Sequence, residues 1–130
     1  MKDIYIFTYG TLKRGFKNHY LLLDDATFVS NAITCEKYQM YPCIIGNGYP
    51  FVIKSENISQ IEGEVYEITS KKTLENIDML EDYPDLYLKE LIKVKLFNEK
   101  IVEALIYFKN EETYLKEIDK SIYMSKWIGN

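Results

Sequence analysis

Glu81 is the acidic side chain that its own segment directs toward the body of the protein. Residues 71–81 carry apolar side chains at Leu74, Ile77 and Leu80, a spacing that predicts an amphipathic helix. On a helical wheel of about 100° per residue, Glu81 falls on the same arc as these three side chains. A carboxylate on an apolar face loses solvation, which raises its pKa and makes it a better proton acceptor near neutral pH. Glu81 is therefore a candidate general base.

Two simpler roles for Glu81 stay open from the sequence. The carboxylate could pair with Lys89 or Lys93, or it could reach water at the end of the helix. The other acidic residues of the segment, such as Asp78, point away from the centre of the apolar arc.

A short loop near the start of the chain is the second candidate site. An apolar run over 4–8 leads into Tyr9-Gly10-Thr11-Leu12. Several backbone N–H groups in one tight turn can bind a carboxylate or a developing oxyanion, and Gly10 permits both the turn and a close ligand. The alternative is an ordinary turn that ends a strand. The glycine and lysine spacing of a phosphate-binding P-loop is absent from the sequence.

Histidine and cysteine are scarce, which narrows the possible chemistry. The chain has one histidine, His19, and two cysteines, Cys35 and Cys43. A zinc site of Cys and His ligands needs about four of them, so at most a partial one could form. We expect no metal and no cofactor. His19 could be a second acid–base group, although a surface or capping role is the simpler interpretation. The cysteines could be redox-active, but small buried side chains are the simpler interpretation.

The elements that must position these residues belong to one domain over 1–130, and the sequence contains no linker or repeat. Extended segments are predicted over 4–8, 27–29, 32–38, 49–54, 61–68, 86–97 and 101–108, with an irregular segment over 41–48. Helices are predicted after Asn18, over 71–81 and over 111–118. Many short strands with few helices indicate an α+β fold. A closed sheet would remove exposed edges, but periodicity cannot prove closure.

The strand predicted over 86–97 alternates regularly. Leu88, Ile92 and the other even-numbered residues are expected to face one way, toward the protein interior. The odd-numbered lysines, Lys89, Lys93 and Lys95, are expected to form the solvated face.

Composition excludes several classes of function. The net charge is -4 and no basic patch is visible, which argues against a nucleic-acid partner. No run of about 18 apolar residues exists to cross a membrane. The first residues lack the apolar stretch of a signal peptide, so we expect the cytoplasm and reduced cysteines. The 12 tyrosines favour strands over a helical bundle, and they allow a homodimer without requiring one.

Four stretches spread over nearly the whole chain carry a further signal. They are Phe7–Gly15 (FTYGTLKRG), Ile61–Tyr66 (IEGEVY), Ile77–Pro84 (IDMLEDYP) with Tyr87, and Trp127. In this order they resemble the gamma-glutamylcyclotransferase-like superfamily, and most closely its small gamma-glutamylamine cyclotransferase branch. Two positions depart from the family pattern. Lys89 stands where an arginine is common, and Asp82 stands where a small residue is common.

The resemblance implies a compact mixed β-barrel with short flanking helices and a pocket at the mouth of the barrel. It implies a catalytic role for Glu81. The substrate-binding residues that it implies are Tyr9, Gly10, Thr11, Leu12 and Tyr87.

The reaction implied is intramolecular aminolysis. The α-amino group of a γ-glutamyl amide attacks its own γ-carbonyl, which gives 5-oxoproline and a free amine, with Glu81 as the base. Such a reaction needs no enzyme nucleophile, which agrees with the scarcity of histidine and cysteine. The partner expected is therefore a small γ-glutamyl substrate whose leaving amine the sequence does not name. The alternative function is a non-catalytic binding module for a small amino-acid-like ligand.

Overall fold

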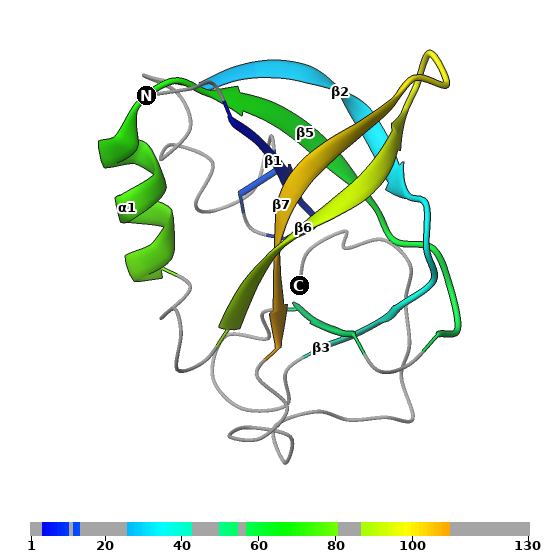
Figure 1. Ribbon diagram of the computed structural model, residues 1–130. Coiled ribbons are helices and arrows are strands. Elements are labelled where there is room, and N and C mark those ends of the chain that lie inside the picture. The colour runs from blue at the N-terminus through cyan, green and yellow to red at the C-terminus, as the bar shows by residue number, and fades with distance from the viewer. Residues whose placement is uncertain are drawn as a thin grey trace.

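Strands far outnumber helices in the part of the chain that the structure describes. The computed structural model describes residues 4–10, 12–13, 26–42, 50–54, 57–80 and 87–109. The elements within these ranges are β1 (Ile4–Thr8), β2 (Ala26–Thr34), β3 (Gln39–Pro42), β4 (Pro50–Ile53), β5 (Glu62–Ile68), α1 (Lys71–Leu80), β6 (Tyr87–Leu96) and β7 (Ile101–Lys109) (Figure 1). The expected mixed, sheet-dominated class with a helix is confirmed. The helices predicted after Asn18 and over 111–118 lie outside the described residues.

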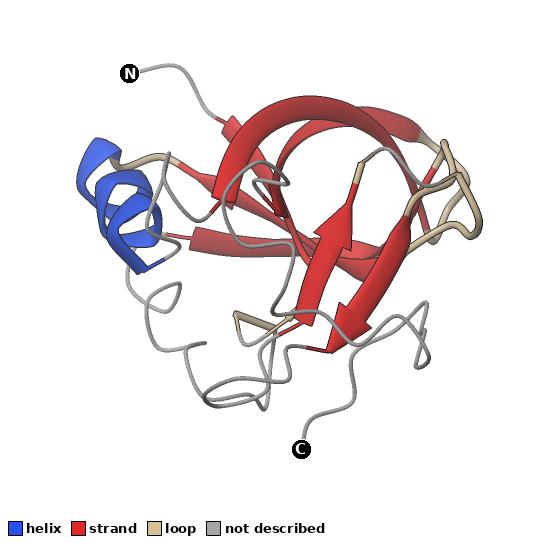
Figure 2. Ribbon diagram, turned by 90° about the horizontal axis from the view of Figure 1, so that it is seen from below, coloured by secondary structure: helices blue, strands red, loops and turns tan. Residues whose placement is uncertain are grey.

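Five strands form one sheet that curves back on itself. Their order is β1-β5-β2-β6-β7, and the two end strands meet to close a barrel. The closing pair, β1 with β7, is parallel and matches Ile6 with Leu105, whereas the neighbours β1–β5, β2–β5, β2–β6 and β6–β7 are antiparallel. Figure 2 shows the strands curving around a ring, with α1 outside it. β3 and β4 pair with each other as a separate two-stranded sheet.

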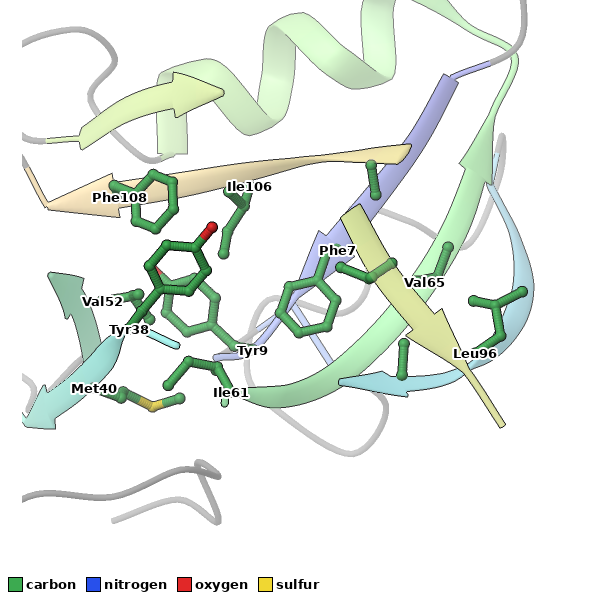
Figure 3. Close-up of a cluster of buried hydrophobic side chains, with 13 residues drawn as sticks. Phe7, Tyr9, Tyr38, Met40, Val52, Ile61, Val65, Leu96, Ile106 and Phe108 are labelled. Atoms are coloured by element: carbon green, nitrogen blue, oxygen red, sulfur yellow. The ribbon is translucent and has the colours of Figure 1, made fainter. Parts of the chain in front are cut away.

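The interior of the barrel is filled by one apolar cluster. Phe7 on β1, Val65 on β5 and Val94 on β6 point into it, together with Ile106 and Phe108 on β7. Figure 3 shows that the cluster continues to Tyr9, Tyr38, Met40 and Val52. The barrel is therefore a packed core, and a ligand site has to lie at its mouth or on its outer surface.

A second buried cluster covers the outer face of the barrel. Ile77 of α1 packs there with Ile6 of β1 and Ile68 of β5, and with Tyr41 and Ile53 from the small sheet. The helix begins after Ser70, whose hydroxyl accepts a hydrogen bond from the Thr73 N–H at 3.4 Å, as an N-cap does. Of the predicted apolar arc, Ile77 is fully buried and Leu74 is half-buried. The arc therefore faces the barrel as expected.

The predicted alternation of β6 holds only in its second half. Ile92, Val94 and Leu96 lie inward, but at the start of the strand Tyr87 is buried and Leu88 is exposed. The buried face changes at this end of β6 because the outer cluster covers the outer face of the strand there, and Tyr87 belongs to that cluster. Lys89 is consequently not part of a solvated face.

Two segments near the middle of the chain also differ from the prediction. The stretch predicted over 27–29 and the first part of the stretch predicted over 32–38 form the single strand β2, which ends at Thr34, so residues 35–38 are not part of it. The register of β2 with β5 shifts between Phe28 and Ser30. The extra residue there is Val29, which is typical of a β-bulge. Tyr41 and Pro42 belong to β3 rather than to an irregular segment.

Candidate active site

The loop that follows β1 is held against β7, the strand that pairs with β1 to close the barrel, by a tyrosine. The Tyr9 ring is buried in the interior cluster, and its hydroxyl donates a hydrogen bond of 2.5 Å to the backbone carbonyl of Tyr107 on β7. The loop then turns sharply, because the Lys13 N–H donates to the Gly10 carbonyl at 3.1 Å. Both the entry to the loop and its turn are thus fixed by hydrogen bonds.

Gly63 on β5 allows the end of β1 to reach this position. A Cβ atom at Gly63 would overlap the carbonyl oxygen of Thr8 and would lie 2.8 Å from Cζ of Phe7. Thr8 pairs with Glu64 in the β1–β5 ladder, and its hydroxyl donates to the Glu64 carbonyl at 3.3 Å. Only a residue without a side chain lets the two strands approach so closely just before Tyr9.

Two other predicted site residues lie together in the outer cluster. Leu12, at the end of the loop, and Tyr87, at the start of β6, are both buried there with Ile77 of α1. Tyr107 belongs to the same cluster and also accepts the hydrogen bond from Tyr9. The structure therefore brings the loop, the helix and the start of β6 to one side of the barrel.

A polar cluster on this side of the barrel joins α1 to β6 and β7. The Lys89 ammonium group on β6 donates to both carboxylate oxygens of Asp78 on α1, at 3.0 Å each. The Tyr107 hydroxyl on β7 donates to Asp78 Oδ1 as well. Asp78 is expected to point away from the centre of the apolar arc, and its carboxylate is nevertheless shielded, since its side chain is only 24% exposed and that of Lys89 is 18% exposed.

Two of the predicted site residues, Glu81 and Thr11, lie outside the described residues, as do His19, Cys43 and Trp127. Glu81 directly follows α1, which ends at Leu80. Among the residues that the structure describes, no group of three or more histidine, cysteine, aspartate or glutamate side chains is placed to hold a metal ion. In the same part of the chain, no helix combines the length and the apolar character needed to cross a membrane.

Comparison of the sequence with known protein families identifies the family of this chain. Residues 6–128 match the family described as gamma-glutamyl cyclotransferase, AIG2-like. The chain belongs to this family. The match includes the Tyr9–Leu12 loop, all of α1 and both strands of the hairpin formed by β6 and β7.

Individual proteins that are similar to this chain carry names from the same family. A protein of Methanocaldococcus jannaschii, provisionally named a gamma-glutamylcyclotransferase, is 44% identical over 80% of this chain and 82% of its own length. Gamma-glutamylaminecyclotransferase C of Danio rerio is 31% identical over 84% of this chain and 77% of its own length. The crystal structure of an AIG2-like protein from Mus musculus superimposes with a TM-score of 0.81 at 25% identity, covering 98% of this chain and 89% of that one.

Sequence reasoning about this cyclotransferase-family chain missed the polar cluster. Asp78 and Lys89 are 11 residues apart, and Tyr107 lies 29 residues beyond Asp78. One signal was available, because Lys89 lies two residues after Tyr87 in a strand and therefore shares its face. Because Tyr87 is a site candidate, the alternation along β6 also predicts that Lys89 lies on the site's side of the strand.

Proposed function

We propose that the protein is an enzyme that converts a γ-glutamyl amine, or a related γ-glutamyl compound, to 5-oxoproline and a free amine. Membership of the gamma-glutamyl cyclotransferase family supports this proposal, as do the relatives named gamma-glutamylaminecyclotransferases. The structural observation that carries the proposal is that one residue of β7 holds both candidate parts of the site. Tyr107 forms hydrogen bonds with Tyr9, which begins the Tyr9–Leu12 loop (the Tyr9 loop), and with Asp78 of α1, the helix that directly precedes Glu81.

The helix supports the assignment of Glu81 as the general base. Thr73 and Ile77 form the buried face of α1, and they are four residues apart. The next position with this spacing in the sequence is Glu81. An acid that continued this buried face would lose solvation, which favours a proton acceptor near neutral pH.

In the proposed reaction the substrate attacks itself. The nitrogen of the α-amino group forms a bond to the γ-carbonyl carbon, and the bond from that carbon to the leaving nitrogen breaks. Glu81 accepts the proton that the attacking nitrogen loses and delivers it to the leaving amine. No water is consumed, because the new amide bond inside the five-membered ring replaces the amide bond that breaks. Holding a flexible substrate in the folded shape that leads to ring closure supplies part of the rate enhancement.

The loop between Gly10 and Leu12 is proposed to bind the negative charge of the substrate. Its backbone N–H groups would hold either the α-carboxylate or the oxyanion that develops on the γ-carbonyl oxygen. The described hydrogen bonds of Tyr9 and Gly10 support this role, because a donor set is effective only when it is held rigidly before the substrate arrives.

A panel of γ-glutamyl amides tests the proposal, with 5-oxoproline release as the readout. The native protein is expected to turn over at least one member of the panel. Glu81→Gln should lower kcat by a factor on the order of 10²–10⁴, because the glutamine amide cannot accept the proton. The matched control is Glu75→Gln, which makes the same change at an exposed position of the same helix and should leave kcat unchanged.

Two outcomes would contradict this proposal in different ways. Activity that survives Glu81→Gln would reject Glu81 as the base. No turnover by the native protein across the panel, combined with binding of a panel member, would favour the non-catalytic binding module.

A further inference from the structure

Asp78 accepts hydrogen bonds from two different strands. Lys89 and Tyr107 are direct partners in the β6–β7 ladder, so their side chains project from neighbouring positions of one sheet face. Both donate to the carboxylate of Asp78, Lys89 through two contacts of 3.0 Å and Tyr107 through its hydroxyl. We refer to these three residues as the Asp78 cluster. The last turns of α1 are thereby attached to two strands at once.

This arrangement differs from an ordinary ion pair on a protein surface. The surface pair of the same chain, Lys54 with Glu90, has a single contact of 2.7 Å and side chains that are 54% and 39% exposed. In the Asp78 cluster the lysine and the aspartate are 18% and 24% exposed, and a third group completes the bonding of the carboxylate. Exposed pairs contribute little because their side chains stay mobile, whereas shielded, multiply bonded pairs fix geometry.

Tyr107 also connects the cluster to the loop. Its hydroxyl donates to Asp78, while its backbone carbonyl accepts the hydrogen bond of 2.5 Å from the Tyr9 hydroxyl. One residue of β7 is thus bonded to α1 on one side and to the start of the Tyr9 loop on the other. Leu12, Ile77 and Tyr107 also share the outer apolar cluster, which limits relative movement of the same parts.

We infer that Asp78, Lys89 and Tyr107 are positioning residues of the active site, which hold the end of α1 at a fixed separation from the Tyr9 loop. Asp78 precedes Glu81 by three residues, so this attachment sets where the segment bearing the base begins. The inference rests on the proposed function, because Glu81 matters only if the protein performs the proton transfer. A shift of about 1 Å in a catalytic group can reduce a rate about 100-fold, so an anchor of this kind controls kcat without touching the substrate.

Two substitutions remove single donors from the Asp78 cluster. Tyr107→Phe deletes the hydroxyl but keeps the ring and the backbone carbonyl that binds Tyr9. Lys89→Met deletes the ammonium group but keeps a long side chain. Each should lower kcat about tenfold or more on folded protein and leave KM within about twofold, because substrate binding depends on the loop. A purely structural role would instead lower the unfolding temperature and leave kcat of the folded protein unchanged.

Two further variants make the comparison specific. Lys89→Arg should restore most of the lost kcat, because a guanidinium group can also donate two hydrogen bonds to one carboxylate. Lys93→Met is the matched control for Lys89→Met. It lies on the same face of β6, is exposed, and should behave like the native protein.

Hydrogen–deuterium exchange supplies a readout that does not depend on turnover. Tyr107→Phe and Lys89→Met should each increase exchange in the peptide that covers 76–87 about tenfold, with β2 and β5 unchanged. Unchanged exchange in this peptide, or unchanged kcat in both folded variants, would overturn the positioning role. Absence of turnover by the native protein would overturn the proposed function instead, and exchange would then decide whether the cluster holds the helix end.

Discussion

Tyr38 keeps its proton more strongly than an ordinary tyrosine does. Burial, together with the nearby carboxylates of Glu36 and Glu90, raises the pKa of its phenol to about 12. The hydroxyl donates to Glu36 Oε2 at 3.2 Å, and the ring packs edge-on against Phe108 at a centroid distance of 4.9 Å. Ionisation would place a phenolate beside a carboxylate in an apolar cluster, which the fold disfavours.

This shift predicts a loss of stability at high pH. The pKa of Tyr38 in the folded protein lies above the ordinary tyrosine value of 10.0. Below pH 10 its contribution to stability is therefore fully present, and the contribution disappears as the pH rises toward 12. The free energy of unfolding of the native protein should therefore fall over this range relative to that of Tyr38→Phe, which has no phenol to ionise. Urea unfolding of both proteins at several pH values measures the difference. A difference that does not change with pH would contradict the assignment.

Single residues of the site were predictable to different degrees. Tyr9, Gly10, Leu12 and Tyr87 were assigned from short motifs, and the structure places Leu12 and Tyr87 in one buried cluster. The functional assignments of all these residues, and that of Glu81, stay predictions. The Asp78 cluster could not be derived from local patterns, because its partners meet only when α1 packs against paired strands. A helical wheel identifies the face of a helix, but it does not identify what that face meets.

Gly63 on β5 lies directly against the backbone of Thr8 on β1, just before the Tyr9–Leu12 loop. Gly63→Ala should destabilise the protein by about 1–3 kcal/mol, because the added methyl group forces the Thr8 backbone away. It should also lower kcat, since the displaced backbone leads directly into Tyr9. Urea unfolding and the 5-oxoproline assay measure both effects. Glu62→Ala, an exposed neighbour on β5, is the control, and equal stability of the two variants would refute the steric argument.

At the scale of elements, the long periodic segments were predicted well. The helix expected over 71–81 is observed as Lys71–Leu80, and the hairpin expected over 86–97 and 101–108 is observed as Tyr87–Leu96 and Ile101–Lys109. The errors have a common cause in tertiary structure. The outer cluster reverses the buried face at the start of β6. In β2, a bulge at Val29 is followed by Ser30 and Asn31, which interrupt the predicted pattern but still pair with β5.

At the scale of the whole molecule, the order of the strands in the sheet could not be predicted from the sequence pattern. Alternation assigns side chains to faces, but it does not say that β5 lies between β1 and β2 or that β7 pairs with β1. That order matters for the proposed function, because it places Tyr107 where it forms hydrogen bonds with both Asp78 of α1 and Tyr9. The family resemblance supplied the expected barrel, whereas local periodicity alone left an open sheet equally possible.

A crystal structure of the protein with bound 5-oxoproline tests the central claim most directly. The product should lie with its carboxylate or its lactam oxygen on the backbone N–H groups between Gly10 and Leu12, and with its ring nitrogen about 3 Å from a carboxylate oxygen of Glu81. A product bound elsewhere, or a Glu81 carboxylate in bulk solvent beyond hydrogen-bond reach of the ligand, would contradict the account.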